Sequence, residues 1–148
     1  MTRAQDVEAL ILAAHRLARV AALDTRNDTP AAQWRTLAIL RESGPQRLGE
    51  LARLSRVTQP GMTRLIGVMA EAGLVDRTPD PEDSRAVRIA ATEKGAAAYA
   101  AWRRELVGAL LPRFAELDED DWAAIRRTAR VLNGKIAANA AQREEGME

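Results

Sequence analysis

The sequence predicts a mainly α-helical protein of the α+β class, and three features support this prediction. Two short amphipathic helices follow one another between residues 48 and 72, with a turn of about three residues between them. Two extended segments then flank a tip rich in proline and aspartate, within residues 75–91. Longer apolar stripes with helical spacing lie before and after this middle part. Together these features predict a winged helix-turn-helix core with a two-stranded wing, flanked by N- and C-terminal helices.

The first short helix carries apolar residues three and four positions apart, which mark one buried face. These residues are Leu48, Leu51, Ala52 and Leu54. The helix is predicted to end at Ser55. Thr58 is predicted to cap the second helix because its hydroxyl can accept an unpaired backbone amide, and Pro60 falls in the first turn, where no intrahelical donor is lost.

The second short helix has an apolar side and a polar side. The apolar stripe is Met62, Leu65, Ile66, Met69 and Ala70, and the residues turned away from it are Gln59, Gly61, Thr63, Arg64 and Gly67. The N-terminal half of such a helix meets base edges in the major groove, where glutamine and arginine make two-pronged contacts to adenine and guanine. The predicted DNA-reading residues are Thr58, Gln59, Gly61, Met62, Thr63 and Arg64, with Arg56 as a candidate phosphate contact.

The wing is predicted from the residues that follow the second helix. Gly73 is expected to end that helix, because glycine adopts the left-handed conformation at a helix C-terminus without steric cost. Residues 75–78 and 86–91 form the two extended segments, and residues 79–84 are predicted to be loop. Arg85 lies at the root of this loop.

This part of the chain resembles the MarR family, the bacterial transcription regulators of the multiple-antibiotic-resistance type. The resemblance rests on the Thr63-Arg64 pair, on Glu-Ala-Gly-Leu-Val-x-Arg at 71–77, and on Asp83-Ser84-Arg85 ahead of Thr92-Glu93-Lys94-Gly95. It covers the middle third of the chain closely and the flanks only as a helical pattern. Two places depart from the family: Ala91 replaces a usual leucine, and Gln46-Arg47 stands where serine or threonine often caps the first helix.

The resemblance implies roles for further residues. In the family, the arginine matched by Arg85 reaches into the minor groove and the aspartate matched by Asp83 holds it in place. MarR-type proteins dimerise through their terminal helices and bind small aromatic or anionic effectors where these helices meet the winged core. His15 and Trp34 are the effector-binding candidates, because each combines an apolar body with a polar group. Both residues are equally compatible with a purely structural role.

Length and composition narrow the function classes. The 148 residues suit one domain, with a DNA-binding core at 30–91 and helical dimerisation regions at 5–23 and 93–140. The chain has no cysteine and one histidine, so neither a disulfide nor a zinc site is expected. No other metal and no cofactor are expected. No run of 18 apolar residues is present, so a membrane-spanning helix is not expected. The expected location is the cytoplasm. The net charge of +1 says nothing about nucleic acid, but residues 46–66 hold four arginines and one glutamate.

The flanking segments complete the expected fold. Thr29-Pro30 is predicted to open a helix as N-cap and first-turn proline, and that helix runs to about Glu42. Thr92 is predicted to cap a long helix that Pro112 ends or kinks, and Asp118 to cap the last helix. A small core cannot bury the apolar stripes of all the terminal helices, so a homodimer is expected.

The sequence therefore predicts a sequence-specific regulator that binds a pseudo-palindromic operator in double-stranded DNA, a repressor released by a small aromatic or anionic effector. A winged-helix module that binds protein instead of DNA is the alternative, because fold alone does not determine function. An enzyme is not expected, since no nucleophile with a base and no phosphate-cradling glycine motif is visible. Three simpler interpretations stay open. The polar side of the second short helix could be only a solvated face, and the Asp83–Arg85 pair could be a surface salt bridge of little energy. The arginine content could reflect genome composition.

Overall fold

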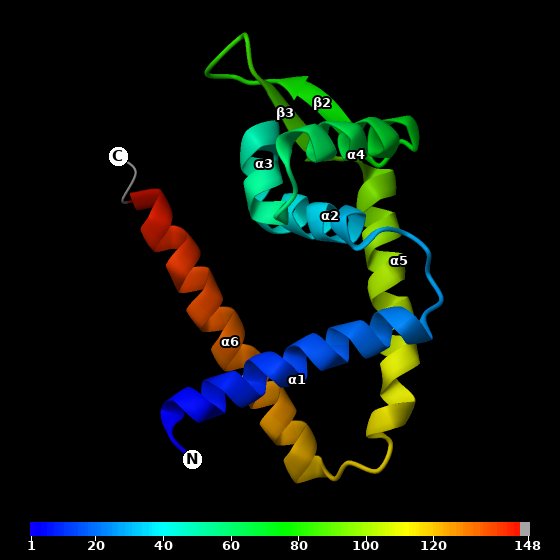
Figure 1. Ribbon diagram of the computed structural model, residues 1–148, viewed down its shortest axis with the longest axis vertical. Coiled ribbons are helices and arrows are strands. Elements are labelled where there is room, and N and C mark those ends of the chain that lie inside the picture. Colours follow the sequence, from blue (N-terminus) through cyan, green and yellow to red (C-terminus); the bar gives the residue numbers. More distant parts are fainter. Residues whose placement is uncertain (146–148) are drawn as a thin grey trace. The chain divides into compact units, whose positions relative to one another are not determined.

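The computed structural model describes residues 1–145 and the side chains of residues 1–137, and the chain divides into two compact units. The first unit ends at Leu110, inside residues 93–140, which were predicted to form one helical dimerisation region. Its elements are α1 (Arg3–Asp24), α2 (Ala31–Ser43), β1 (Gln46–Arg47), α3 (Leu48–Ser55), α4 (Gln59–Glu71), β2 (Val75–Pro79), β3 (Val87–Ala91) and α5 (Glu93–Leu110) (Figure 1). The second unit contains the short 3₁₀ helix η1 (Leu111–Phe114) and α6 (Glu119–Glu145).

The hydrophobic core of the first unit lies among α2, α3, α4 and the sheet. Met62, Ile66 and Met69 of α4 are completely buried, as their i, i+4, i+7 spacing on one helix face predicts. Leu54 was predicted on the buried face of α3 but is 37% exposed, and that prediction is wrong. Positions 51, 52 and 55 share the inner face of α3, so Ser55 takes the buried place and lies 3.4 Å from the hydroxyl of Thr36.

The sheet has three antiparallel strands in the order β1-β3-β2, one strand more than predicted. In β1, Gln46 pairs with Ile89 and Arg47 with Arg88. A strand of two residues carries no alternating pattern, so the sequence could not indicate it. Pro79 was predicted to be loop but is the last residue of β2, opposite Val87. Because β2 is an edge strand, the missing N–H of proline is tolerated there.

The helix α1 begins with a side-chain cap, whereas α2 begins without one. The helix α1 begins at Arg3 because Thr2 and Gln5 form a reciprocal capping box, with Oγ1 of Thr2 accepting from the Gln5 amide at 3.2 Å. Thr29 does not cap α2, contrary to prediction: Pro30 is the N-cap residue, and the Thr29 amide donates to Oδ1 of Asn27 at 2.9 Å. Asn27 thus shapes the connection before α2.

The start of α5 is tied to the end of α4. The hydroxyl of Thr92 accepts a hydrogen bond from the Gly95 amide at 3.0 Å, which confirms the predicted cap, and donates to the Gly73 carbonyl at 2.6 Å. A Cβ placed on Gly95 would lie 2.0 Å from the carbonyl oxygen of Leu74. Thr92 and Gly95 therefore serve one close contact, between the first turn of α5 and the chain that leaves α4. Gly73 has φ 73°, as its predicted helix-ending role requires.

In the second unit, α6 begins directly after Asp118, whose Oδ1 accepts from the Asp121 amide at 2.9 Å, so the predicted cap is confirmed. The helix α5 ends two residues before Pro112, which lies in η1. The rings of Phe114 and Trp122 pack at 6.1 Å between centroids and join η1 to α6. Among the described helices, none is long and apolar enough to cross a membrane.

Candidate nucleic-acid interface and ligand cavity

The start of α4 presents a polar surface. Oγ1 of Thr58 accepts from the Gly61 amide at 3.2 Å, so the predicted cap is confirmed. Thr58, Gln59, Thr63 and Arg64 are exposed and Gly61 is half-buried. Met62 was predicted to be a DNA-reading residue, and this prediction is wrong. Its side chain is completely buried, because it shares the inner helix face with Ile66.

Gly61 has a structural reason to be glycine. A Cβ at this position would lie 3.0 Å from Oγ1 of Thr58 and 3.0 Å from Cγ1 of Val57, tighter than most real contacts. The small residue therefore lets the cap and the turn close against α4. It also leaves the backbone of the first helical turn open to an approaching duplex.

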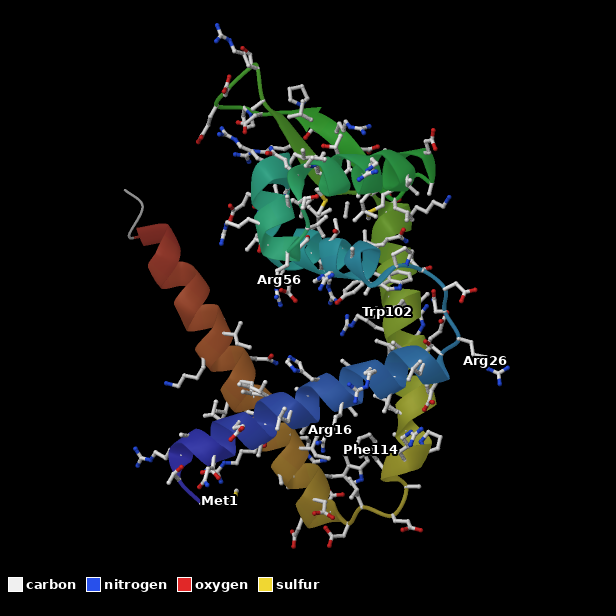
Figure 2. The ribbon with its side chains drawn as sticks, in the orientation of Figure 1. Met1, Arg16, Arg26, Arg56, Trp102 and Phe114 are labelled. Carbon is white, nitrogen blue, oxygen red and sulfur yellow. The ribbon has the colours of Figure 1, made fainter. Side chains whose placement is uncertain are left out.

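Arg56 lies in the turn between α3 and α4 with φ 57°, a left-handed conformation that is uncommon for a non-glycine residue. Its amide donates to the Arg53 carbonyl at 3.2 Å and closes the end of α3. Figure 2 shows Arg56 at the end of α3 that lies farther from the wing. A phosphate contact by Arg56 stays a prediction. Such a contact would lie on a different part of the duplex from the part that the wing would contact.

The wing loop is organised by Asp83. Its Oδ1 accepts from the backbone amide of Arg85 at 2.9 Å, and its carbonyl accepts from the Ala86 amide at 3.0 Å. Asp83 thus orders the backbone beneath Arg85, whereas a salt bridge to the guanidinium is not among the contacts of the described residues. The Arg85 side chain is exposed beyond this turn.

A buried carboxylate at the root of the wing was missed from the sequence. The side chain of Asp80 has no accessible surface, and its Oδ2 accepts from Nε of Arg47 at 2.6 Å and from Nε of Arg88 at 3.2 Å. Its Oδ1 accepts from the Glu82 amide at 2.8 Å. The hydrogen bond from Arg47 is the main reason why the pKa of Asp80 lies far below its ordinary value. The sequence signal was slight: an acid between two prolines, with partners that only strand register supplies.

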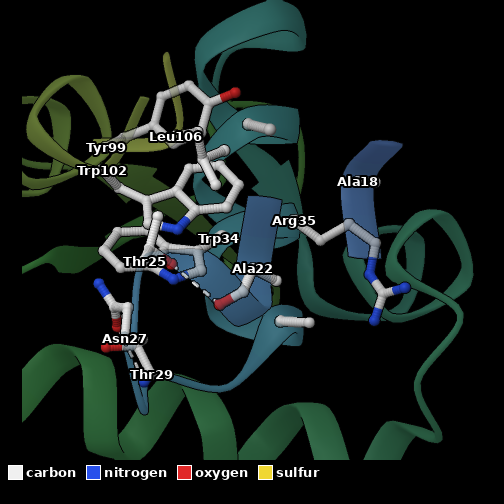
Figure 3. Close-up of a pocket in the computed structure, with 12 residues that line it drawn as sticks. Ala18, Ala22, Thr25, Asn27, Thr29, Trp34, Arg35, Tyr99, Trp102 and Leu106 are labelled. Atoms are coloured by element: carbon white, nitrogen blue, oxygen red, sulfur yellow. Dashed lines mark hydrogen bonds between the residues drawn. The ribbon is translucent and has the colours of Figure 1, made fainter. Parts of the chain in front are cut away.

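A cavity of about 390 Å³ lies among α1, α2, α5 and the connection between α1 and α2 (Figure 3). Its lining residues are Ala18, Ala22, Thr25, Asn27, Thr29, Ala31, Trp34, Arg35, Ala38, Tyr99, Trp102 and Leu106. Trp34 and Trp102 stack with centroids 5.0 Å apart and planes 10° from parallel, and Tyr99 continues the stack at 5.9 Å. Figure 3 shows Arg35 across the cavity from these rings. The lining is mainly apolar, with three aromatic rings and one cationic side chain.

Of the two effector candidates, the structure places one in this cavity. Trp34 lines it, whereas His15 is an exposed residue of α1 outside the lining. His15 lies about one helical turn before Ala18, and its side chain is exposed. Three residues not singled out earlier, Arg35, Tyr99 and Trp102, belong to the lining instead. Burial raises the pKa of Tyr99, so this ring enters the cavity as a neutral phenol.

Comparison with known proteins identifies the family. Residues 30–87 match the MarR family. The HTH-type transcriptional regulator ML2140 of Mycobacterium leprae is 34% identical over 124 residues, which cover 83% of this chain and 87% of that protein. The HTH-type transcriptional repressor NicR of Pseudomonas putida is 30% identical over 99 residues, 67% of this chain and 58% of that protein.

Solved structures agree on the fold. The transcriptional regulator Tm0710 of Thermotoga maritima superposes with a TM-score of 0.73 at 23% identity, over 94% of this chain and 99% of that one. BpsR of Bordetella bronchiseptica, whose DNA binding is regulated by 6-hydroxynicotinic acid, superposes with a TM-score of 0.56 at 21% identity, over 85% and 91% of the two chains. The matched core, the relative matched over most of its length and the shared fold lead to one conclusion: this chain belongs to the MarR family and is a DNA-binding transcriptional regulator.

Proposed function

We propose that this protein is a homodimeric repressor that binds a pseudo-palindromic operator and is released from it by a small aromatic acid. The observation that carries the DNA-binding part is the exposed polar start of α4 beside the wing, with Gln59 and Arg64 on the helix and Arg85 on the loop. A module that binds protein would favour apolar or aromatic residues at these places. The repressor assignment takes its support from the relative NicR.

The two arginines are proposed to read different features of the operator. Arg64 lies on the helix that would enter the major groove, where arginine pairs with guanine through two hydrogen bonds. Arg85 is carried by the wing, at the level of an adjacent minor groove, where a narrow A·T-rich groove attracts arginine through its negative potential. Two copies in a two-fold dimer would contact half-sites whose centres lie about 34–36 Å apart.

Selection of bound fragments from genomic DNA, followed by fluorescence anisotropy with the recovered duplex, tests this assignment. Arg64→Ala is expected to cost about 1–3 kcal/mol and to relax preference at one base pair of each half-site. Arg85→Ala is expected to weaken binding most where the minor groove is narrow. Recovery of no enriched fragment, or an unchanged base preference in Arg64→Ala, would contradict the proposed placement of α4.

The dimer part of the proposal is supported by apolar side chains of α1 that are only half covered. Val7, Ile11 and Leu17 lie on one side of α1, and each exposes between 45% and 56% of its surface. Contiguous apolar surface of this kind is expected to be covered by another copy of the protein. The same helix lines the cavity through Ala18 and Ala22, so dimer contacts and ligand contacts share one element.

The effector part of the proposal rests on the aromatic cavity and on the ligand response of BpsR. A planar ring would pack against the Trp34–Trp102 stack, and Arg35 would pair with its carboxylate. To release DNA, the ligand must bind more tightly to a protein conformation that the operator does not accept, because equal affinity for both conformations shifts nothing.

Titration of salicylate and 6-hydroxynicotinic acid into a preformed protein–DNA complex tests the effector site. Arg35→Gln removes the cation from an exposed position and is expected to raise the ligand concentration needed for release about tenfold, the loss of one charged hydrogen bond. His15→Ala, one turn away but outside the lining, is the matched control and is expected to respond like the unmodified protein. An equal response of all three proteins would exclude this cavity.

A further inference from the structure

The charged residues at the root of the wing form a group that the base-reading residues do not explain. Arg47 and Arg88 lie directly opposite each other on neighbouring strands, in the register of β1 and β3. Like charges in this position repel and destabilise a sheet. Asp80 compensates one of the two charges, so the three side chains together have a formal charge of about +1, and the carboxylates of Glu82 and Asp83 also act electrostatically on Arg47.

The geometry directs this remaining charge outward. Ile89 is buried, so the neighbouring Arg88 points to the opposite face of the sheet, away from the core. Asp80 receives the Nε–H of both arginines, and within the described residues no hydrogen bond or ion pair engages their terminal nitrogens. Half of the Arg47 side chain and a third of the Arg88 side chain remain accessible. Each guanidinium is therefore held at its inner nitrogen and free at its outer fork.

The arginine pair adjoins both elements that are proposed to bind DNA. A Cβ on Gly49, two residues after Arg47, would lie 3.5 Å from Nε2 of Gln59, so the start of α3 adjoins the start of α4. On the other side, the Asp80 amide donates to the Ala86 carbonyl at 3.1 Å and closes the wing loop that carries Arg85. The arginine pair thus lies between the two elements proposed to enter the grooves.

We infer that Arg47 and Arg88 form a clamp for one DNA backbone phosphate, and that Asp80 is the positioning residue that holds both guanidinium groups toward it. A guanidinium fork matches the oxygens of a phosphate diester through paired, charge-assisted hydrogen bonds. The nearby carboxylate of Glu50 does not compete, because Arg53 binds it at both oxygens, with one N···O distance of 3.0 Å. This clamp rests on the proposed DNA-binding function and adds contacts that fix register without reading sequence.

The salt dependence of binding separates this role from base reading. Each lost phosphate contact lowers the slope of log affinity against log salt by about 0.9, hence by about 1.8 for a dimer. Because both arginines would serve one phosphate, the double variant Arg47→Gln/Arg88→Gln is expected to show this full loss and a roughly tenfold weaker affinity, the same for the selected operator and for a mixed-sequence duplex. Each single variant is expected to show a part of this loss. The matched control is Arg26→Gln, which removes one exposed arginine from the connection between α1 and α2, far from the wing (Figure 2).

Asp80→Asn tests the positioning role, because the added charge and the lost geometry predict opposite changes in DNA affinity. The variant gains one positive charge per chain and would bind DNA more tightly if Asp80 only neutralised the arginines. If Asp80 orients them, the salt slope falls and binding weakens in spite of the added charge. The two arginine variants decide the clamp independently of this one. Thermal melting shows whether all three variants are folded, because each arginine substitution also removes a partner from the buried Asp80 carboxylate.

The outcomes are distinct. If the unmodified protein binds neither duplex, the proposed function fails and the clamp fails with it. If the unmodified protein binds and both arginine variants keep its salt slope, only the clamp is overturned. A reduced slope with loss of base preference at one position would assign these arginines to base reading instead and overturn the phosphate role.

Discussion

At the scale of single residues, Gly95 shows how a close backbone contact overrides helix propensity. An alanine side chain would place its Cβ 2.0 Å from the Leu74 carbonyl oxygen, a distance that real atoms do not reach. We expect Gly95→Ala to destabilise the protein by about 1–3 kcal/mol or more through forced backbone movement. Gly108, in the same helix with nothing within 4 Å of its Cβ position, is the matched control. Gly108→Ala is expected to stabilise by up to about 1 kcal/mol in urea unfolding.

Asp80 carries the pH dependence that can be predicted at this scale. Its pKa in the folded chain is depressed, mainly by the hydrogen bond from Arg47, below the value of about 4 that an unfolded carboxyl has. The stabilisation is therefore complete above about pH 4 and is lost as the pH falls further. We expect the stability difference between the unmodified protein and Asp80→Asn to shrink below pH 4 in unfolding curves. A difference that grows as the pH falls would contradict the pairing.

At the scale of elements, the junction between α4 and α5 depends on one hydroxyl. Oγ1 of Thr92 both caps α5 and binds the Gly73 carbonyl, so Thr92→Val removes two hydrogen bonds at nearly constant volume. We expect a loss of about 2 kcal/mol, about half from the cap and half from the unpaired carbonyl. Thr92→Ser keeps the hydroxyl and is expected to lose less than half as much. An unchanged stability of Thr92→Val would contradict this role of the hydroxyl, because valine keeps the methyl group of threonine and lacks only the oxygen.

At the scale of the whole molecule, association is the property to measure. Light scattering at micromolar concentration is expected to give about twice the chain mass of 16.2 kDa, because α1 exposes an apolar stripe in the single chain. Leu17→Asp places a charge on this stripe and is expected to shift the protein toward monomer. Val68→Asp, at an exposed site of α4, is the control and is expected to leave the mass unchanged. A monomeric unmodified protein would overturn the proposed dimer.

The sequence alone determined the features that depend on local chemistry. The caps Thr58, Thr92 and Asp118 were predictable because a side chain satisfies amides two or three residues away. The inner face of α4 was predictable because the period of 3.6 residues places Met62, Ile66 and Met69 together, although the same rule excluded Met62 from the DNA surface.

The tertiary structure decided what depends on residues far apart in the chain. Arg47 and Arg88 become neighbours only through the register of β1 and β3, and Asp80 is buried only because the wing folds back on that pair. The cavity likewise joins Trp34 to Trp102 across 68 positions, through the packing of α2 on α5. Such contacts leave no period or spacing in a single sequence, because each partner's position is set by the path of the whole chain between them.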